Sequence, residues 1–129
     1  GVRALLDTLT FLWFILDDTR LSPRAASIVS DTSNDIAVSP ASLWEIAIKI
    51  SLGKYSLNAP FDTFMEEQVA RNRFEVLPIL IRHLAALANL PFHHRDPFDR
   101  LLVAQAIIEG IPILSADAEL DAYRVARLW

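Results

Sequence analysis

Short apolar runs alternate along this chain with longer segments in which apolar residues recur at helical spacing. A short apolar run bounded by turn residues is typical of a strand that is buried on both faces, as in a parallel sheet. The runs predict buried strands at residues 4–6, 35–39, 74–79 and 111–114, and an edge strand at residues 125–128.

The segments between these runs carry helix signals. Ser22-Pro23, Ser39-Pro40 and Asp96-Pro97 each place a capping side chain before a proline at the first helical position. Gly53 and Gly110 fit the ends of two helices. The predicted helices span residues 9–16, 23–30, 40–52, 61–73, 82–89, 98–109 and 118–122. Strands that alternate with helices in this way predict one α/β domain, residues 1–129, with a central, mostly parallel sheet.

The composition narrows the class of protein. Hydrophobic residues make up 53% of the chain and charged residues 22%, which indicates a globular protein. No glycine-rich phosphate-binding motif occurs, which argues against a dinucleotide or nucleoside triphosphate site, and the absence of cysteine excludes disulfides and thiolate metal sites. The most apolar run, residues 9–16, is shorter than the roughly 20 residues that span a bilayer, and no secretory cleavage pattern follows it. We therefore expect a cytoplasmic protein.

Five acidic residues lie at the edges of the apolar segments: Asp7, Glu45, Asp96, Asp99 and Asp117. Most of them follow a predicted strand and precede a helix. Because the carboxyl ends of parallel strands meet at one edge of a sheet, we expect these side chains to gather there. Clustered carboxylates repel one another unless a cation neutralises them, and oxygen ligands suit Mg²⁺ or Mn²⁺. The pattern predicts a metal-dependent enzyme that acts on phosphate esters.

Each acid also has a purely structural explanation. Asp7, Asp96 and Asp117 can be helix N-caps, and residues 42–45 (Ser-Leu-Trp-Glu) match a capping box. The glutamate of that box has the spacing of a helical ion pair with Lys49. Caps explain the acids one at a time, but not why every predicted strand exit carries one. A carboxylate directly after three apolar residues, as at Asp7, is also costly to bury without a partner.

The net charge of −4 bears on how the protein could bind RNA or DNA, because proteins that grip nucleic acid by broad phosphate neutralisation are usually basic. Attraction would have to come from bound metal and a few local cations, namely Lys49, Lys54, Arg95 and Arg100. Arg95 or Arg100 is predicted to steady the phosphate, since guanidinium binds phosphate oxygens bidentately. A salt bridge to a nearby acid is an equal alternative for Arg100. The acidic balance also suits a basic protein partner.

The other polar candidates are interpreted as secondary. The histidines His83, His93 and His94 lack the spacing of a helical metal-binding pair, and we interpret all three as loop or surface residues. The serines Ser39, Ser42 and Ser115 have no histidine in a context that suggests a catalytic triad. Ser115 is expected instead to support a metal-bound acid by hydrogen bonding. The first helix is apolar nearly all round, so we assign it to the core, with part of its surface available to a dimer or a partner helix.

Four segments resemble the PIN-domain family, and within it the VapC-type toxins of toxin–antitoxin pairs: residues 6–8 (LDT), 39–49 (SPASLWEIAIK), 93–105 (HHRDPFDRLLVAQ) and 114–117 (LSAD). The resemblance implies a three-layer α/β/α sandwich. It implies an Mg²⁺- or Mn²⁺-dependent endoribonuclease whose metal-binding, catalytic acids match Asp7, Glu45, Asp99 and Asp117, with Asp96 as a further acid. It also implies a homodimer that is inhibited by a small VapB-like antitoxin, whose tail presents a basic residue to the acids. Many relatives carry histidine where this chain has Leu9.

The predicted reaction is therefore cleavage of RNA by a metal-activated water, because a bound divalent ion lowers the pKa of its water. Two alternatives remain. Residues 5–10 (LLDTLT) suggest a haloacid-dehalogenase-like phosphatase, although Leu9 stands where that chemistry needs a second acid. The other alternative is a catalytically silent PIN-like module that binds a protein partner.

Overall fold

Five strands form the centre of the structure, a computed structural model that describes all of residues 1–129. Their order across the sheet is β3-β2-β1-β4-β5, and every neighbouring pair is parallel. The strands are β1 (Arg3–Leu6), β2 (Asp35–Val38), β3 (Glu75–Val76), β4 (Ile113–Leu114) and β5 (Arg127–Leu128). The predicted α/β class and the parallel sheet are confirmed.

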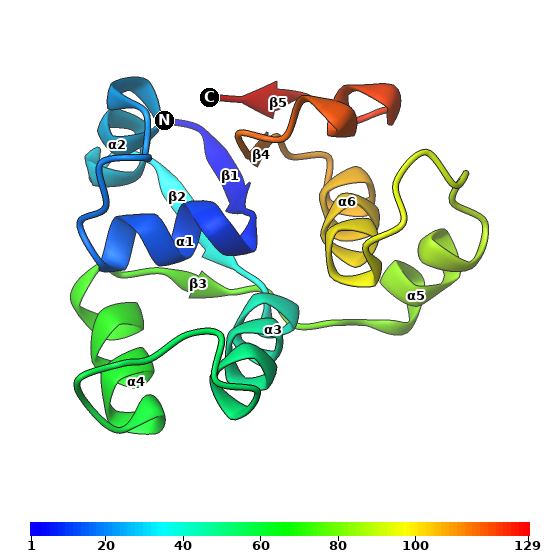
Figure 1. The fold of residues 1–129 in the computed structure, drawn as a ribbon. Coiled ribbons are helices and arrows are strands. Elements are labelled where there is room, and N and C mark those ends of the chain that lie inside the picture. The colour runs from blue at the N-terminus through cyan, green and yellow to red at the C-terminus, as the bar shows by residue number, and fades with distance from the viewer.

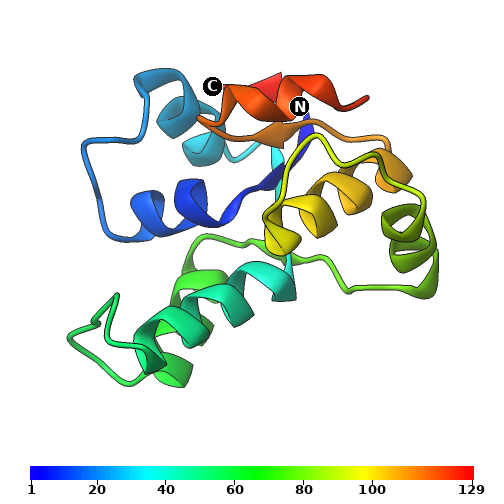
Figure 2. The ribbon, with the colours of Figure 1, turned by 45° about the vertical axis from the view of Figure 1, so that its right-hand side comes forward.

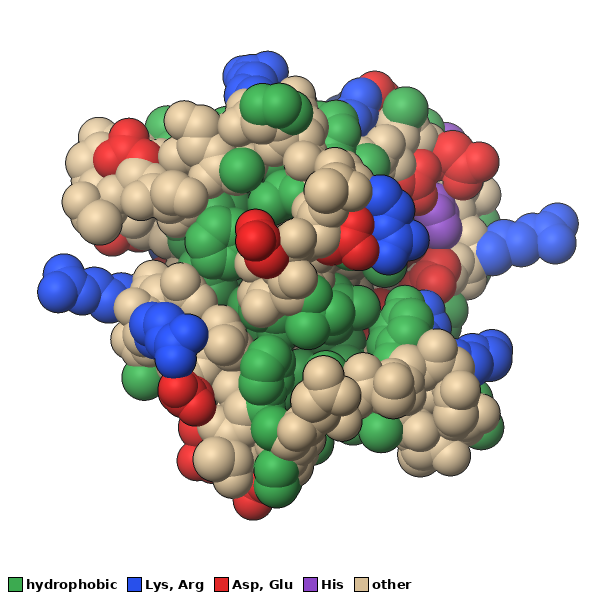
Figure 3. Space-filling view, turned by 60° about the vertical axis from the view of Figure 1, so that its left-hand side comes forward, with side chains coloured by type: hydrophobic (Ala, Val, Ile, Leu, Met, Phe, Trp, Pro, Cys, Tyr) green, Lys and Arg blue, Asp and Glu red, His purple; other side chains and the backbone are tan.

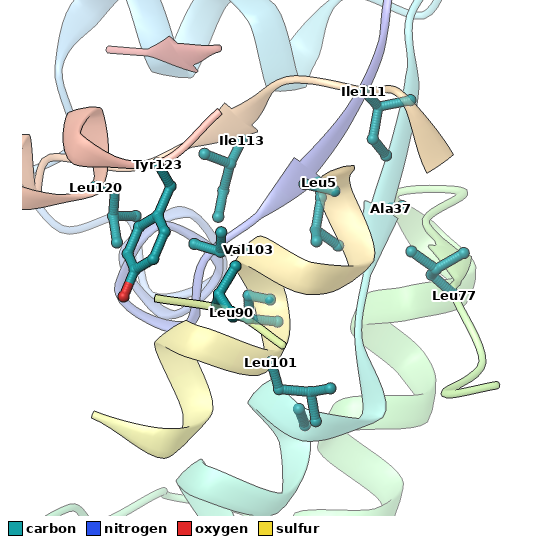
Figure 4. Packing of buried hydrophobic residues seen from close by; sticks show 13 residues of the cluster. Leu5, Ala37, Leu77, Leu90, Leu101, Val103, Ile111, Ile113, Leu120 and Tyr123 are labelled. Carbon is teal, nitrogen blue, oxygen red and sulfur yellow. The ribbon is translucent and has the colours of Figure 1, made fainter. Parts of the chain in front are cut away.

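Helices cover both faces of this sheet (Figures 1 and 2). They are α1 (Thr8–Ile15), α2 (Pro23–Ser30), α3 (Pro40–Ser51), α4 (Phe61–Arg71), α5 (Ile81–Ala88), α6 (Pro97–Glu109) and the 3₁₀ helix η1 (Ala118–Ala122). Alternate strand residues point to opposite faces, so the chain has two cores. In one, Leu5 and Ile113 of neighbouring strands pack with Val103 of α6 (Figure 4). In the other, Ala4 and Leu6 pack with side chains of α1 and α2. The three-layer α/β/α sandwich is thus confirmed.

The predicted helix boundaries agree closely with the structure, because the capping signals act locally. The hydroxyls of Ser22 and Ser39 each accept a backbone N–H in the first turn of α2 and α3, at 3.1 Å. Gly110 ends α6 with a left-handed φ of 67°. The capping box predicted at residues 42–45 is wrong, since Ser39 is the N-cap. Ser42 lies one turn further on, where its hydroxyl accepts from the Thr8 hydroxyl at 3.0 Å.

Several predicted elements are shorter or tighter than expected, among them the edge strand predicted at residues 125–128, which pairs only at Arg127 and Leu128. The strand predicted at residues 74–79 pairs only at Glu75 and Val76, because Pro78 has no N–H to continue the ladder. The strand at residues 111–114 likewise begins after Pro112. Residues 118–122 form a 3₁₀ helix.

The apolar helix α1 lies mostly inside the molecule, as expected. Phe11 and Trp13 are buried, whereas Leu9 and Leu16 are exposed. These two leucines are the part of the helix that remains available to another chain. Every helix, including this one, falls short of the length and apolar character that a bilayer-spanning segment requires.

The two cores generate a stability prediction. Leu102 of α6 is fully buried, so Leu102→Ala should lower the free energy of unfolding by about 2–5 kcal/mol. Leu52, at the end of α3, is 63% exposed, and Leu52→Ala should change it by less than about 0.5 kcal/mol. Urea unfolding of both variants, followed by circular dichroism, measures the difference. Equal losses at the two positions would contradict the core described here.

Candidate metal centre

The acidic residues meet where the strand order of the sheet reverses. Strand β1 lies between β2 and β4. From β2 the chain continues to β3 on one side of β1, and from β4 it continues to β5 on the other side. Ligands bind at such switch points, outside the carboxyl ends of the strands. Asp7 directly follows β1 and Asp117 follows β4, while Glu45 lies on α3 and Asp99 on α6, helices that pack against each other. The structure therefore brings the predicted acids to one edge.

Asp7 is the most constrained of these acids. Its backbone N–H donates to the carbonyl of Leu114 at 3.0 Å, which ties the ends of β1 and β4 together. Its carboxylate caps α1, where Oδ1 accepts the Thr10 N–H at 2.9 Å, and it also contacts the Ser115 hydroxyl. Burial raises the pKa of Asp7, these hydrogen bonds oppose the rise, and the charge of Asp117 adds to it. This contact is the kind expected of Ser115, whose support of a metal-bound acid stays a prediction.

The pKa of Asp99 shows the effect of burial and of the neighbouring acids. It occupies the first turn of α6, and its side chain is 23% exposed. Burial, followed by the charges of Asp96, Asp7 and Glu45, raises the pKa of Asp99 to about 7, although His94 opposes the shift. The carboxyl of Asp99 is therefore partly protonated at neutral pH when no cation is bound. A divalent ion at this edge would displace that proton.

Glu45 contributes an oxygen that has no hydrogen-bond partner. The residue is 6% exposed, and Oε2 forms the predicted ion pair with Lys49 at 2.9 Å. Its second oxygen, Oε1, is buried and unpartnered. A buried carboxylate oxygen without a donor is costly, so a group that accepts this lone pair, such as a cation, would stabilise the site. Because Glu45 lies beyond the first turn of α3, capping does not explain it.

The two remaining acids act as caps, as the structural explanation predicted. Oδ1 of Asp96 accepts the N–H groups of Phe98 and Asp99, at 2.8 and 3.0 Å, and so starts α6. Oδ1 of Asp117 accepts the Glu119 N–H at 3.0 Å and so starts η1. Capping uses one oxygen of each carboxylate. Asp117 keeps its second oxygen toward the other acids, where it meets His94 at 2.9 Å.

His94 is a residue of this centre that the sequence did not reveal. Its Nε2 lies 2.9 Å from Asp117, 3.5 Å from Asp99 and 3.7 Å from Glu119. Burial lowers the pKa of His94. The hydrogen bond to Asp117 and the surrounding negative charges raise it by more, so the pKa lies above its usual value. Figure 3 shows a face of the molecule on which acidic side chains gather beside a histidine. The position of His94 in the sequence, two residues before an Asp-Pro cap, gave no signal of its contact with Asp117.

The interpretation of the histidines as loop or surface residues is correct for His93, which is exposed, and for His94, which lies in a loop, but wrong for His83. His94 is in a loop but faces the acids. His83 is fully buried on α5, where Nδ1 accepts the Leu80 N–H at 3.0 Å and Nε2 lies 3.0 Å from Glu109. That pairing fastens α5 to the end of α6.

The sequence matches the PIN domain over residues 4–127. The chain belongs to the PIN domain family. No curated protein sequence matches it.

Several solved structures share the fold of this PIN domain. A chain of VapBC2 from Rickettsia felis, solved bound to a promoter DNA fragment, is 14% identical, with a TM-score of 0.73 and 99% of each chain covered. FitAcB from Neisseria gonorrhoeae is 18% identical, with a TM-score of 0.67 over 98% of this chain and 96% of that one. VapBC-5 from Mycobacterium tuberculosis, of the VapBC family of toxin–antitoxin systems, is 15% identical, with a TM-score of 0.61 over 99% and 100%.

Arg100 of this PIN domain has neither of the two roles predicted for it. It is buried, and its guanidinium donates to the carbonyls of Pro91 and Leu90, at 2.7 and 3.2 Å, and to the Tyr123 hydroxyl at 3.3 Å. The ring of Phe92 covers it at 3.9 Å. These contacts fix the loop before α6, so Arg100 is not directed at the acids. Arg95 is exposed and remains the predicted phosphate contact.

The raised pKa of Asp99 generates a prediction for stability in the absence of metal. The folded protein keeps the Asp99 proton to about pH 7, whereas the unfolded chain loses it near 3.8. The unfolded state therefore binds fewer protons between these values, and the free energy of unfolding falls as the pH rises from about 4 to about 7. Because asparagine cannot ionise, Asp99→Asn should stabilise the protein at pH 8 by about 2–4 kcal/mol.

Urea unfolding in EDTA, at pH 5 and pH 8, measures this effect. Asp35→Asn is the matched control, since Asp35 is exposed at the start of β2, away from the acids. That variant should keep the pH dependence of the wild type. An Asp99→Asn protein with the same pH dependence as the control would show that burial and the neighbouring acids do not raise the pKa of Asp99.

Proposed function

We propose that this PIN domain is a metal-dependent endoribonuclease and the toxin of a VapBC-type toxin–antitoxin pair. The observation that carries the proposal is the convergence of buried carboxylates at one sheet edge, where one oxygen of Glu45 has no partner. A site of this kind is unfavourable unless a cation enters it. Family membership and the shared fold support the same activity.

The donor set fits a hard divalent cation. Asp7, Glu45, Asp99 and Asp117 offer carboxylate oxygens and no sulfur, which suits Mg²⁺ or Mn²⁺. When bound, such an ion supplies an activated water at neutral pH and neutralises the scissile phosphate of RNA. We propose these four residues as its ligands, with Asp96 adding negative charge from the cap of α6.

The other residues of the centre hold these ligands in place. The Thr10 N–H and the Ser115 hydroxyl orient Asp7, and Lys49 occupies the outer oxygen of Glu45. The Asp96 cap fixes the start of α6 and thereby the position of Asp99. These supports would hold the proposed ligands in position before substrate arrives. Arg95, exposed beside the cap, is proposed to contact the RNA phosphate.

The proposed partner is a small antitoxin of the VapB kind, because several structures that share the fold are VapBC or FitAB assemblies. A protein of net charge −4 with an acidic edge suits a basic antitoxin segment. We also propose a homodimer, for which the exposed leucines of α1 supply apolar surface. An RNA substrate would place this activity in the cytoplasm.

The two alternatives receive less support. A phosphatase of the haloacid-dehalogenase kind needs a second acid two residues after the nucleophile, and here Leu9 projects from α1 instead. A silent binding module would not need a buried, unpartnered Glu45 oxygen or an Asp99 whose pKa is about 7.

The proposal predicts metal-dependent cleavage of RNA. End-labelled structured RNA, incubated with the purified protein, should be cut with Mg²⁺ or Mn²⁺ and left intact with EDTA. Asp7→Asn and Asp99→Asn should each abolish cutting because each removes a charged ligand, while Asp35→Asn should cut like the wild type. Circular dichroism verifies that the variants are folded.

Binding of Mn²⁺ is measured on the same samples by thermal unfolding. An ion that binds only the folded state raises the melting temperature, and the two ligand variants should lose most of this shift. A protein free of bound inhibitor that shows neither cutting nor a metal-dependent shift would overturn the proposal in favour of the silent module. Metal binding without cutting would retain the centre and reject this RNA as substrate.

A further inference from the structure

We propose that His94 is a positioning residue of the metal centre. In this role its Nε2–H holds the carboxylate of Asp117 in place, and His94 does not itself bind the metal. The inference rests on the proposed function in taking Asp117 as a ligand. It goes further in assigning a role to a residue whose sequence position indicated none.

The hydrogen bonds of the ring decide where its proton lies. Nδ1 of His94 accepts the backbone N–H of Asp96 at 3.1 Å. An Nδ1 that accepts a hydrogen bond carries no proton, so the hydrogen of the neutral ring must be on Nε2. Nε2 is the atom that lies 2.9 Å from Oδ2 of Asp117. The charged ring also carries a hydrogen on Nε2, so the contact to Asp117 is a donated hydrogen bond in either state.

Two buried side chains anchor the loop that carries His94. The Tyr123 hydroxyl accepts the backbone N–H groups of both His93 and His94, at 3.1 and 2.9 Å. Arg100 in turn donates to that hydroxyl at 3.3 Å and to two carbonyls of the loop. Tyr123 and Arg100 are both buried. A histidine held at both its backbone and its Nδ1 presents Nε2 to the acids in one orientation.

Asp117 needs such a partner more than the other acids do. Its side chain is 36% exposed and follows the short strand β4, whereas Asp7 and Glu45 are buried. Apart from His94, the side chain of Asp117 accepts only the Glu119 N–H. Hydrogen bonds to ligand carboxylates orient them for the metal. The hydrogen bond from His94 therefore gives Asp117 the order that burial gives Asp7 and Glu45.

The geometry opposes the other role that a histidine beside acids suggests. Nε2 of His94 lies close enough to Asp117 and Glu119 for the three side chains to share a metal ion. A metal on Nε2 would require the ring proton to move to Nδ1, where it would face the Asp96 N–H. The bond from Asp96 thus keeps His94 out of the ligand set, which stays all oxygen, the donor set that suits Mg²⁺ and Mn²⁺.

Metal-binding measurements test the role of His94 directly. Dissociation constants for Mn²⁺, from the electron paramagnetic resonance signal of the free ion, and for Zn²⁺, by competition, are compared among variants. His94→Leu should weaken Mn²⁺ binding by about 10–100-fold, the usual effect of losing an orienting partner. His94→Gln, which keeps an N–H near the Nε2 position, should restore most of the affinity. His93→Leu, at the exposed neighbour, is the matched control and should bind Mn²⁺ like the wild type.

Two comparisons separate positioning from the alternatives. A positioning role predicts the same loss for Mn²⁺ and Zn²⁺, and almost no further loss when His94→Leu is added to Asp117→Asn. A much larger loss for Zn²⁺ would make His94 a ligand and overturn the proposal. A His94→Leu protein with unchanged Mn²⁺ affinity, or a failure of glutamine to restore it, would also overturn the proposal.

The ring proton is checked independently of metal by ¹⁵N–¹H correlation spectra of the metal-free protein, at a pH where His94 is neutral. The structure predicts the Nε2–H form, and an Nδ1–H form would refute the inference. Failure of the wild type to bind Mn²⁺ would instead reject the proposed function, so the two results can be told apart.

Discussion

The repulsion among carboxylates at the switch point of the sheet is the constraint on which the rest of the site depends. A parallel sheet in the order β3-β2-β1-β4-β5 sends Asp7 and Asp117 to the same edge. The helices α3 and α6, which pack together there, add Glu45 and Asp99. Burial of Asp99, together with the charges of Asp96, Asp7 and Glu45, raises its pKa to about 7, so the four negative charges cannot all be retained at low cost. The fold thus gathers negative charge that a bound divalent cation would neutralise.

The chain offsets this repulsion only in part, with its own donors. Lys49 neutralises the outer oxygen of Glu45, the Thr10 N–H stabilises Asp7, and His94 donates to Asp117. These donors do not satisfy every carboxylate oxygen, since Oε1 of Glu45 stays buried and unpartnered. A core selected for stability alone would have replaced such acids by apolar residues. Retaining them at a cost in stability is typical of a functional site.

Much of the fold could be predicted because its signals are local. Serine or aspartate before proline starts three helices, and glycine ends one, wherever the rest of the chain lies. The gathering of acids could also be predicted, since parallel strands end at one edge. The roles of His94, His83 and Arg100 could not, because their partners Asp117, Glu109 and Tyr123 lie 23 to 26 residues away in the sequence. Their roles depend on how the loop before α6 folds back, and no spacing rule describes that.

The acidic balance of the chain has a consequence for regulation under the proposed function. Several cations are already engaged, among them Lys49 with Glu45, Arg71 with Glu67 and Arg127 with Asp121. Little positive charge is left to attract RNA over a broad surface, so the phosphate must be held mainly where the metal sits. A basic antitoxin side chain that reaches the same carboxylates would relieve the same repulsion. Metal and antitoxin would then compete for one set of negative charges, and each would weaken the binding of the other by the same factor.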